Sequence, residues 1–128
     1  MSDQDIGPSF RQEQRYMLAW AANTFTADVA CDRRERAFRA IEEALELAQA
    51  CGLSQEDVDR VTERVFDREP GQIDLEIGQS AMSLAILSEV HGIDMPLAMI
   101  MEFNRVQTIP KEEFEKRHAE KVEAGIAI

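Results

Sequence analysis

The sequence has few cysteines and few positive charges, and each shortage excludes a class of protein. Cys31 and Cys51 are too few for a disulfide framework and form no CxxC motif, so we expect both to be reduced and mostly structural. Lys and Arg number 14 against 25 Asp and Glu, a formal net charge of −11. Because basic side chains dominate binding to nucleic acids and anionic membranes, neither is an expected partner. An anionic substrate would need a cation to mediate its binding.

Long apolar runs and targeting signals are also missing. The most apolar segment, residues 83–101, is interrupted by charged residues, by Gly92 and by Pro96, so no transmembrane helix fits it. The leading MSDQDIGPSF has neither the basic nor the apolar region of a secretory signal. We therefore expect a soluble, cytoplasmic protein.

The apolar residues recur at helical spacing, and no segment alternates as a strand does. Gly52 and Gly92 are predicted helix stops, and Ser54 with Asp57 resembles a capping box. The predicted helices cover about 10–29, 32–51, 54–67, 73–91 and 94–107, with a last charged helix after Pro110. We expect an all-α bundle in a single domain, 1–128, with its core in 10–107 and a peripheral charged helix and tail in 108–128.

The helix predicted over 32–51 has an acidic side. A helical wheel places Glu42 at the rim of its apolar face, whereas Glu43 and Glu46 point away from that face. One interpretation is an ordinary solvated face supported by neighbouring arginines. The other is that these glutamates form half of a metal site.

The helix predicted over 73–91 is apolar on two nearly opposite sides, which predicts burial or a subunit contact. Between the two apolar stripes runs a polar line that includes Glu76 and Gln79. A carboxylate in such surroundings needs a partner. Glu76 is either favoured by the helix N-terminus, paired with an arginine, or set to meet the acidic face of the helix over 32–51.

The sequence contains no motif for other kinds of catalytic site. The two histidines, His91 and His118, have no zinc-ligand spacing, and the chain contains no GxSxG, GxGxxG or glycine-rich phosphate loop.

Two motifs together resemble a known family. "EEALE" at 42–46, followed by "EIGQ" at 76–79 and "HGIDMPLAMIMEFNR" at 91–105, is similar to the MazG-like all-α nucleoside triphosphate pyrophosphohydrolases. Their signature is EExxE followed by ExxD, and Gln79 stands here where the family has Asp. The gap of 29 residues between Glu46 and Glu76 is at the long end of the family range. The resemblance covers about residues 20–105.

The resemblance implies a fold, an activity and a set of residues. The fold would be an antiparallel helical bundle whose four-helix core is completed by oligomerisation, as a homodimer or homotetramer. The activity would be hydrolysis of a (d)NTP to a (d)NMP and pyrophosphate with Mg²⁺, or Mn²⁺, in nucleotide-pool housecleaning. The implied catalytic residues are Glu42 and Glu43; the metal ligands are Glu43, Glu46, Glu76 and Gln79; the substrate-binding residues are Trp20, Phe25, Asn104 and Arg105.

Two alternatives to this enzyme stay open. Because Gln79 adds no charge, the chain could be a catalytically weakened homo-oligomer that binds a nucleotide or a partner. It could also be an acidic interaction protein that uses only its surface charge.

Overall fold

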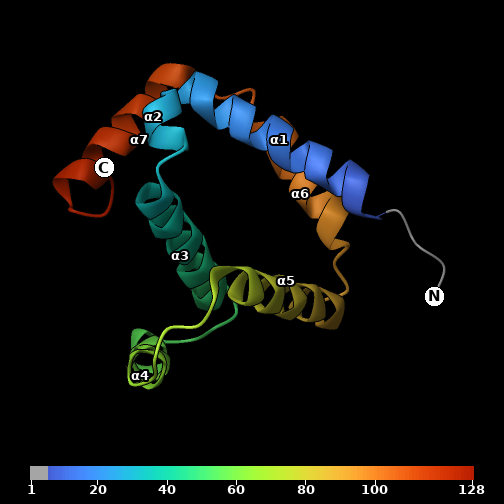
Figure 1. Ribbon diagram of the computed structural model, residues 1–128, viewed down its shortest axis with the longest axis vertical. Helices are drawn as coiled ribbons and strands as arrows, with labels where there is room; N and C mark the ends of the chain where they lie inside the picture. Colours follow the sequence, from blue (N-terminus) through green and yellow to red (C-terminus); the bar gives the residue numbers. More distant parts are fainter. Residues whose placement is uncertain (1–5) are drawn as a thin grey trace. The chain divides into compact units, whose positions relative to one another are not determined.

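The computed structural model describes residues 6–128, with side chains from Phe10 onward, so residues 1–5 of the leading segment read for a secretory signal lie outside it. The described chain is all-α: it forms seven helices and no strand (Figure 1). They are α1 (Ile6–Thr24), α2 (Ala27–Ala30), α3 (Arg33–Ala50), α4 (Gln55–Phe66), α5 (Ile73–Val90), α6 (Met95–Val106) and α7 (Lys111–Glu123).

Local capping chemistry accounts for several of these boundaries. Ser54 and Asp57 form the predicted capping box at α4, each side chain bonded to the other residue's backbone N–H. The Asp94 carboxylate accepts a hydrogen bond from the N–H of Leu97 at 2.9 Å at the start of α6. The boundaries of the five predicted helices after residue 31 are confirmed to within a residue or two.

Three helices end in the same way. Gly52, Gly92 and Gly125 follow α3, α5 and α7 and have positive φ angles of 89°, 66° and 78°. The residue after each glycine donates its N–H to a carbonyl five positions earlier, as in the bond from Ile126 to Lys121. These are Schellman stops, which glycine forms without a Cβ clash.

The structure corrects the prediction of one continuous helix over 10–29, because two helices lie there. The structure ends α1 at Thr24 and starts α2 at Ala27, because Thr26 is extended and its hydroxyl accepts a hydrogen bond from Val29 N–H at 3.1 Å. Apolar spacing continues through this break, so periodicity alone did not reveal it. A threonine that caps a new helix interrupts the old one.

The described chain divides into two compact units. The first unit contains residues 6–43 and Phe103–Ile128, and the second contains Ala44–Glu102. The division falls inside α3 and inside α6, which each contribute to both units. The single domain expected over 1–128 stays a prediction.

The first unit is built around an aromatic cluster. Trp20 packs edge to face on Phe25, Phe103 and Phe114, with ring centroids 6.4, 6.4 and 5.4 Å away. Phe25 and Phe114 also meet at 5.9 Å. Such pairs contribute about 0.5–1.5 kcal/mol each beyond the area that they bury. Ala21 and Ala30 are buried in the same unit.

Helix α7 lies in the segment expected to be a peripheral charged helix, 108–128, and a few of its side chains contact the rest of the first unit. Phe114 belongs to the aromatic cluster, and the ring of His118 lies 5.8 Å from that of Phe25. Most residues of α7 are charged, which is why the sequence suggested a solvated helix. A few side chains on one face nevertheless fix it to the rest of the first unit.

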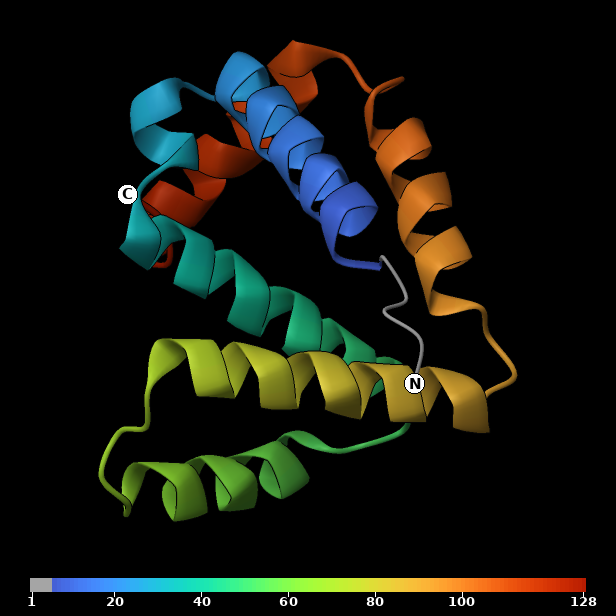
Figure 2. The same cartoon turned by 45° about the vertical axis from the view of Figure 1, so that its right-hand side comes forward.

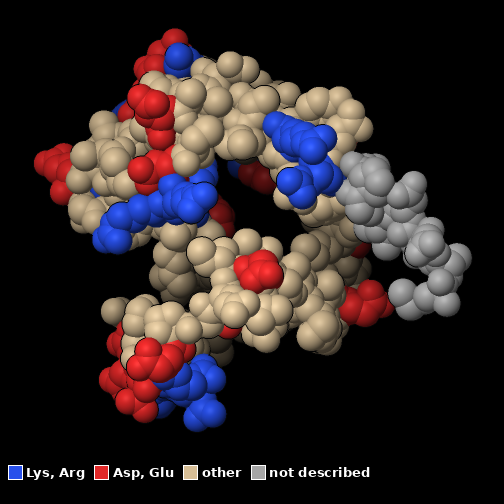
Figure 3. Space-filling view, viewed as in Figure 1, with Lys and Arg blue, Asp and Glu red and all other residues tan. Residues whose placement is uncertain are grey.

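The second unit has no buried side chain. Ile73, Ile77 and Val90 of α5 are 77%, 64% and 78% exposed. The loop of residues 67–72 turns the chain back from α4 into α5 (Figure 2). In Figure 3 the charged side chains of this unit gather over α4, and uncharged atoms cover most of its remaining visible surface. The prediction that α5 is buried within the described chain was wrong. The alternative prediction, that α5 forms a subunit contact, stays a prediction.

Neither of the two most apolar helices, α5 and α6, meets the requirements for a membrane span by itself. No single described helix is long and apolar enough to cross a membrane. Helices α5 and α6 meet the length and composition requirements only as a pair, and the chain bends by 100° between them.

The capping box makes a testable prediction about pH. The backbone hydrogen bond from Ser54, then that from its hydroxyl, then Arg60 lower the pKa of Asp57 below its ordinary 3.8. Because the folded pKa is the lower one, the stabilisation is present above pH 3.8 and is lost as the pH falls through the folded pKa. We expect the free energy of unfolding of Asp57→Asn, measured by urea titration, to approach that of the wild type as the pH falls below this value. Asp59→Asn is the control, since Asp59 lies on the same helix outside the capping box. An equal pH dependence in both variants would contradict the prediction.

Candidate functional site

The first predicted motif lies on α3. This helix begins where the Asp32 carboxylate accepts a hydrogen bond from the N–H of Glu35 at 2.9 Å. Glu42, Glu43 and Glu46 follow within a little over one turn. The Glu42 side chain is only 23% exposed, in keeping with its predicted place at the rim of the apolar face. Glu43 and Glu46 are exposed.

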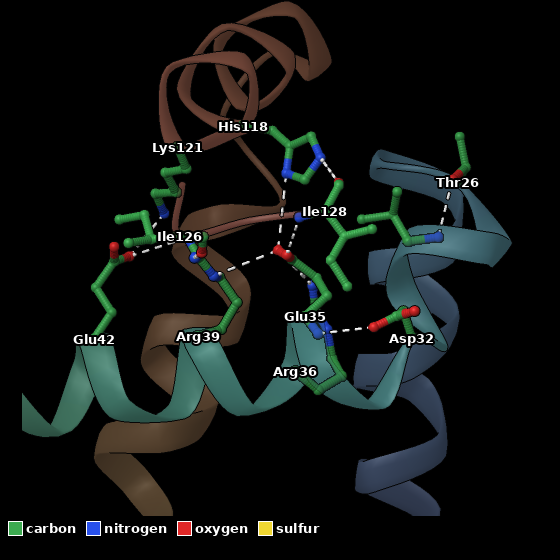
Figure 4. A network of polar contacts seen from close by, with 11 residues as sticks. Thr26, Asp32, Glu35, Arg36, Arg39, Glu42, His118, Lys121, Ile126 and Ile128 are labelled. Atoms are coloured by element: carbon green, nitrogen blue, oxygen red, sulfur yellow. Dashed lines mark hydrogen bonds and ion pairs between the residues drawn. The ribbon is translucent and has the colours of Figure 1, made fainter. Parts of the chain in front are cut away.

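Two cations contact Glu42 (Figure 4). Lys121 of α7 places its Nζ 2.8 Å from Glu42 Oε1, and Arg39 Nη1 donates to the same oxygen at 3.4 Å. Both pairs are partly buried, since the lysine and arginine side chains are 31% and 18% exposed. The negative charge of this motif residue is therefore compensated within the first unit.

A more deeply buried carboxylate lies two turns earlier on α3. Glu35 is 1% exposed, and its Oε1 has three basic neighbours: Arg39 Nε at 3.4 Å, Arg36 Nη2 at 3.6 Å and His118 Nδ1 at 3.8 Å. Its Oε2 accepts a hydrogen bond from the backbone N–H of Ile128 at 3.0 Å. A buried carboxylate of this kind is tolerated only with such partners.

The last residues of the chain complete this network. Arg39 Nη2 donates to the Ile126 carbonyl, and His118 Nε2 lies 2.9 Å from the Ile128 carbonyl oxygen (Figure 4). Sequence reasoning missed this arrangement. The i, i+4 spacing of Glu35 and Arg39 was a local signal, but nothing local pointed to His118 or to residues 126–128.

The second motif lies at the start of α5, in the second unit. Glu76 donates its backbone N–H to the Gln72 carbonyl at 3.0 Å, and its side chain folds back over Gly71, where an added Cβ would collide with Oε1. Gln79 lies one turn further on, and both side chains are exposed. The i, i+3 spacing places both oxygen donors on one side of the helix.

The predicted substrate-binding residues are all in the first unit. Trp20 and Phe25 are half-buried and belong to the aromatic cluster, so their rings already have packing partners. Asn104 and Arg105 lie on the last turns of α6 and are exposed. The structure thus brings the two rings together and leaves the two polar residues on a surface.

The donor atoms of the two motifs suit magnesium. Glu43, Glu46 and Glu76 offer carboxylate oxygens and Gln79 an amide oxygen, which are hard ligands of the kind that Mg²⁺ prefers alongside several waters. Within residues 6–128, however, no group of three or more His, Cys, Asp or Glu side chains is arranged to hold an ion. The metal site stays a prediction that rests on ligand type and spacing.

Neither cysteine of the chain is in a disulfide. Cys31 and Cys51 are free and exposed, which differs from the mostly structural role expected of them. Cys51 Sγ lies 3.9 Å from His91 Nε2, where α3 and α5 end. This is a weak contact between two side chains.

Comparisons of the chain with protein-family models, with curated proteins and with solved structures found no match. The resemblance to the MazG-like family therefore depends on the motif residues alone.

The Glu35 network yields a prediction about stability. Glu35→Gln keeps the size of the side chain but removes the charge that faces three basic groups, so we expect it to lower the free energy of unfolding by about 2 kcal/mol. Glu35→Ala removes the acceptor altogether and should cost more, about 3–5 kcal/mol. Urea denaturation followed by circular dichroism measures both.

Glu120→Gln is the matched control, because this exposed residue of α7 is also a glutamate. We expect its stability to lie within about 0.5 kcal/mol of the wild type. A Glu35→Gln variant as stable as this control would contradict the assigned role of Glu35.

Proposed function

We propose that the protein is an Mg²⁺-dependent nucleoside triphosphate pyrophosphohydrolase that converts a (d)NTP to a (d)NMP and pyrophosphate. The observation that carries the proposal is the pair of acidic helical motifs, Glu42–Glu43–Glu46 on α3 and Glu76–Gln79 on α5. Each motif offers oxygen donors at i, i+3 spacing on one helix. The net charge of −11 favours a small anionic substrate bridged by a cation over a nucleic acid or a membrane.

Each motif residue has a role that its chemistry supports. When bound, Mg²⁺ would neutralise phosphate charge and would stabilise the leaving pyrophosphate. Glu43, Glu46 and Glu76 supply negative charge to hold such an ion, and Gln79 supplies a neutral oxygen. Glu42 is a further ligand or orients the attacking water.

The first unit supplies groups for the nucleoside. Trp20 and Phe25 already pack in the aromatic cluster, and only the exposed part of their rings would be suited to a base. Asn104 and Arg105 offer a hydrogen-bonding group and a cation suited to the sugar and phosphates. Their exposure or half-burial supports a role in substrate binding.

The proposed architecture is a MazG-like antiparallel bundle whose four-helix core is completed by a second copy. The large exposed apolar side chains of α5 support it, since a soluble monomer rarely exposes a contiguous apolar surface of this kind. A homodimer or homotetramer would cover them.

Gln79 favours a second candidate function. An amide in place of a carboxylate removes one negative charge from the ligand set, which weakens each divalent ion. The alternative is thus a homo-oligomer of the same fold that binds a nucleotide or a partner with little or no turnover.

Pyrophosphate release from a panel of standard and modified (d)NTPs tests the enzyme directly. We expect release with Mg²⁺ or Mn²⁺ and none with EDTA. Glu43→Ala and Glu76→Ala should lower kcat/KM at least a hundredfold, because each removes a charged ligand. Gln79→Asp should raise it by restoring the fourth carboxylate.

Glu63→Ala is the control, since this exposed glutamate lies on α4 outside both motifs. Its activity should equal that of the wild type. No product from any nucleotide, together with no metal-dependent thermal shift, would rule the enzyme out. Nucleotide binding without product would support the alternative.

The oligomeric state is a separate prediction. Light scattering coupled to size exclusion should give at least twice the chain mass of 14.5 kDa. Ile77→Asp, which places a charge on the exposed apolar side of α5, should shift the protein towards the monomer. Ser80→Asp, a change on the polar line of the same helix, is the control. A wild-type monomer would contradict the proposed assembly.

A further inference from the structure

Helix α4 has an apolar stripe that the described chain leaves largely uncovered. Its members recur at i, i+3, i+7 and i+8 and therefore share one side of the helix: Val58, Val61, Val65 and Phe66. None of them is buried, and Phe66 is 84% exposed. The stripe is thus open to another surface.

The local contacts of α4 set its shape before anything covers the stripe. The capping box holds its first turn, and the Thr62 hydroxyl donates to the Val58 carbonyl at 2.9 Å. Arg60 pairs with Glu56 and Asp57 at 3.5 and 3.3 Å. A helix of 12 residues is nevertheless marginal in water unless its apolar side packs on something. A partner that covered the stripe would therefore stabilise a helix that is already formed.

The charges beside the stripe are not balanced. Asp59 and Glu63 lie at i, i+4 on the flank next to Phe66, and two like charges at this spacing repel each other. Both are exposed, and neither has a cation partner within residues 6–128. Arg64 lies on the opposite flank. Positive charges on a partner would remove the repulsion between Asp59 and Glu63.

The second unit as a whole has the same sign of charge. Ala44–Glu102 contains 12 acidic and three basic residues, so it holds a net charge of −9 out of −11 for the whole chain. No Lys or Arg occurs between Arg68 and Arg105. A second copy of this unit would meet α4 with like charge, whereas a basic surface would meet it with opposite charge. Charge complementarity thus favours a basic partner over self-association at α4.

We infer that α4 is a docking surface for a basic amphipathic helix of another protein. The partner lays its apolar side on the stripe and directs lysines or arginines toward Asp59 and Glu63, as paired amphipathic helices do. The stripe supplies affinity, and the acidic flank selects the orientation of the partner and the sign of its charge. The inference uses α4 alone and does not depend on the proposed function, which assigns the second copy to α5.

Fluorescence anisotropy of a labelled synthetic peptide, titrated with the full chain, tests the inference. The peptide is about four helical turns long, with leucines along one side and lysines elsewhere. We expect saturable binding that weakens as salt rises, because salt screens exposed charges. A peptide of the same composition whose order scatters the leucines should bind at least about tenfold more weakly, and a peptide with glutamates for the lysines should not bind.

Variants of the full chain locate the binding on α4. Phe66→Ser removes the largest apolar group of the stripe, and we expect it to lower the affinity at least about tenfold. Asp59→Asn combined with Glu63→Gln removes the acidic flank and should lower the affinity about fivefold. Asp74→Asn combined with Glu89→Gln is the matched control, because it removes two exposed acidic charges from the same unit outside α4. Its affinity should stay within about twofold of the wild type.

The other outcomes would overturn the inference. No binding of the leucine–lysine peptide, or binding that Phe66→Ser leaves unchanged, would show that the stripe is not a docking surface for such a helix. Equal losses in the two double variants would show that the peptide responds to net charge and not to α4. A wild-type oligomer that Phe66→Ser dissociates in light scattering would show that a second copy covers the stripe. A lower urea midpoint of monomeric Phe66→Ser would show that the chain itself covers it.

Discussion

The packing of the first unit depends on one carboxylate that is buried away from water. Glu35 is almost fully buried, and an unpaired charge there would cost several kcal/mol. Its partners come from α3, from α7 and from the residues after α7, so the charge is satisfied only when these segments are together. The aromatic cluster supplies apolar packing for the same helices, but it does not specify their register. The carboxylate does, because its partners must arrive at particular atoms.

The two units differ in how far they bury their apolar side chains. The first has Trp20 in contact with three other rings and buries Ala21 and Ala30. The second leaves the apolar side chains of α4 and α5 largely exposed, including Phe66 at 84%. Helix α5 is apolar on two nearly opposite sides, and a helix of that pattern is stable in water only when other surfaces cover both sides. The described chain does not itself provide that cover, which supports the proposed association with a second copy.

Local patterns predicted most of the helices, and long-range contacts escaped prediction. Ser54 and Asp57, Gly52 and Gly92 act within a few residues of themselves, so their effect on helix boundaries could be read from the sequence. The break at Thr26 was missed because the apolar spacing runs through it. The contact between Lys121 and Glu42 joins residues far apart in the chain, and two other lysines and many other glutamates could have paired instead. Glu43, Glu46, Glu76 and Gln79 were identified by resemblance, and their convergence on one ion stays a prediction.

The end of the chain is recognised through its backbone. Arg39 binds the carbonyl of residue 126, Glu35 the N–H of residue 128 and His118 the carbonyl of residue 128, and none of these contacts involves an isoleucine side chain. Gly125 sets the direction from which this segment returns. Selection on these three contacts therefore acts on spacing rather than on identity. Positions 126–128 can exchange residues other than proline with little effect on them, whereas one insertion or deletion after Gly125 would move every donor and acceptor out of register.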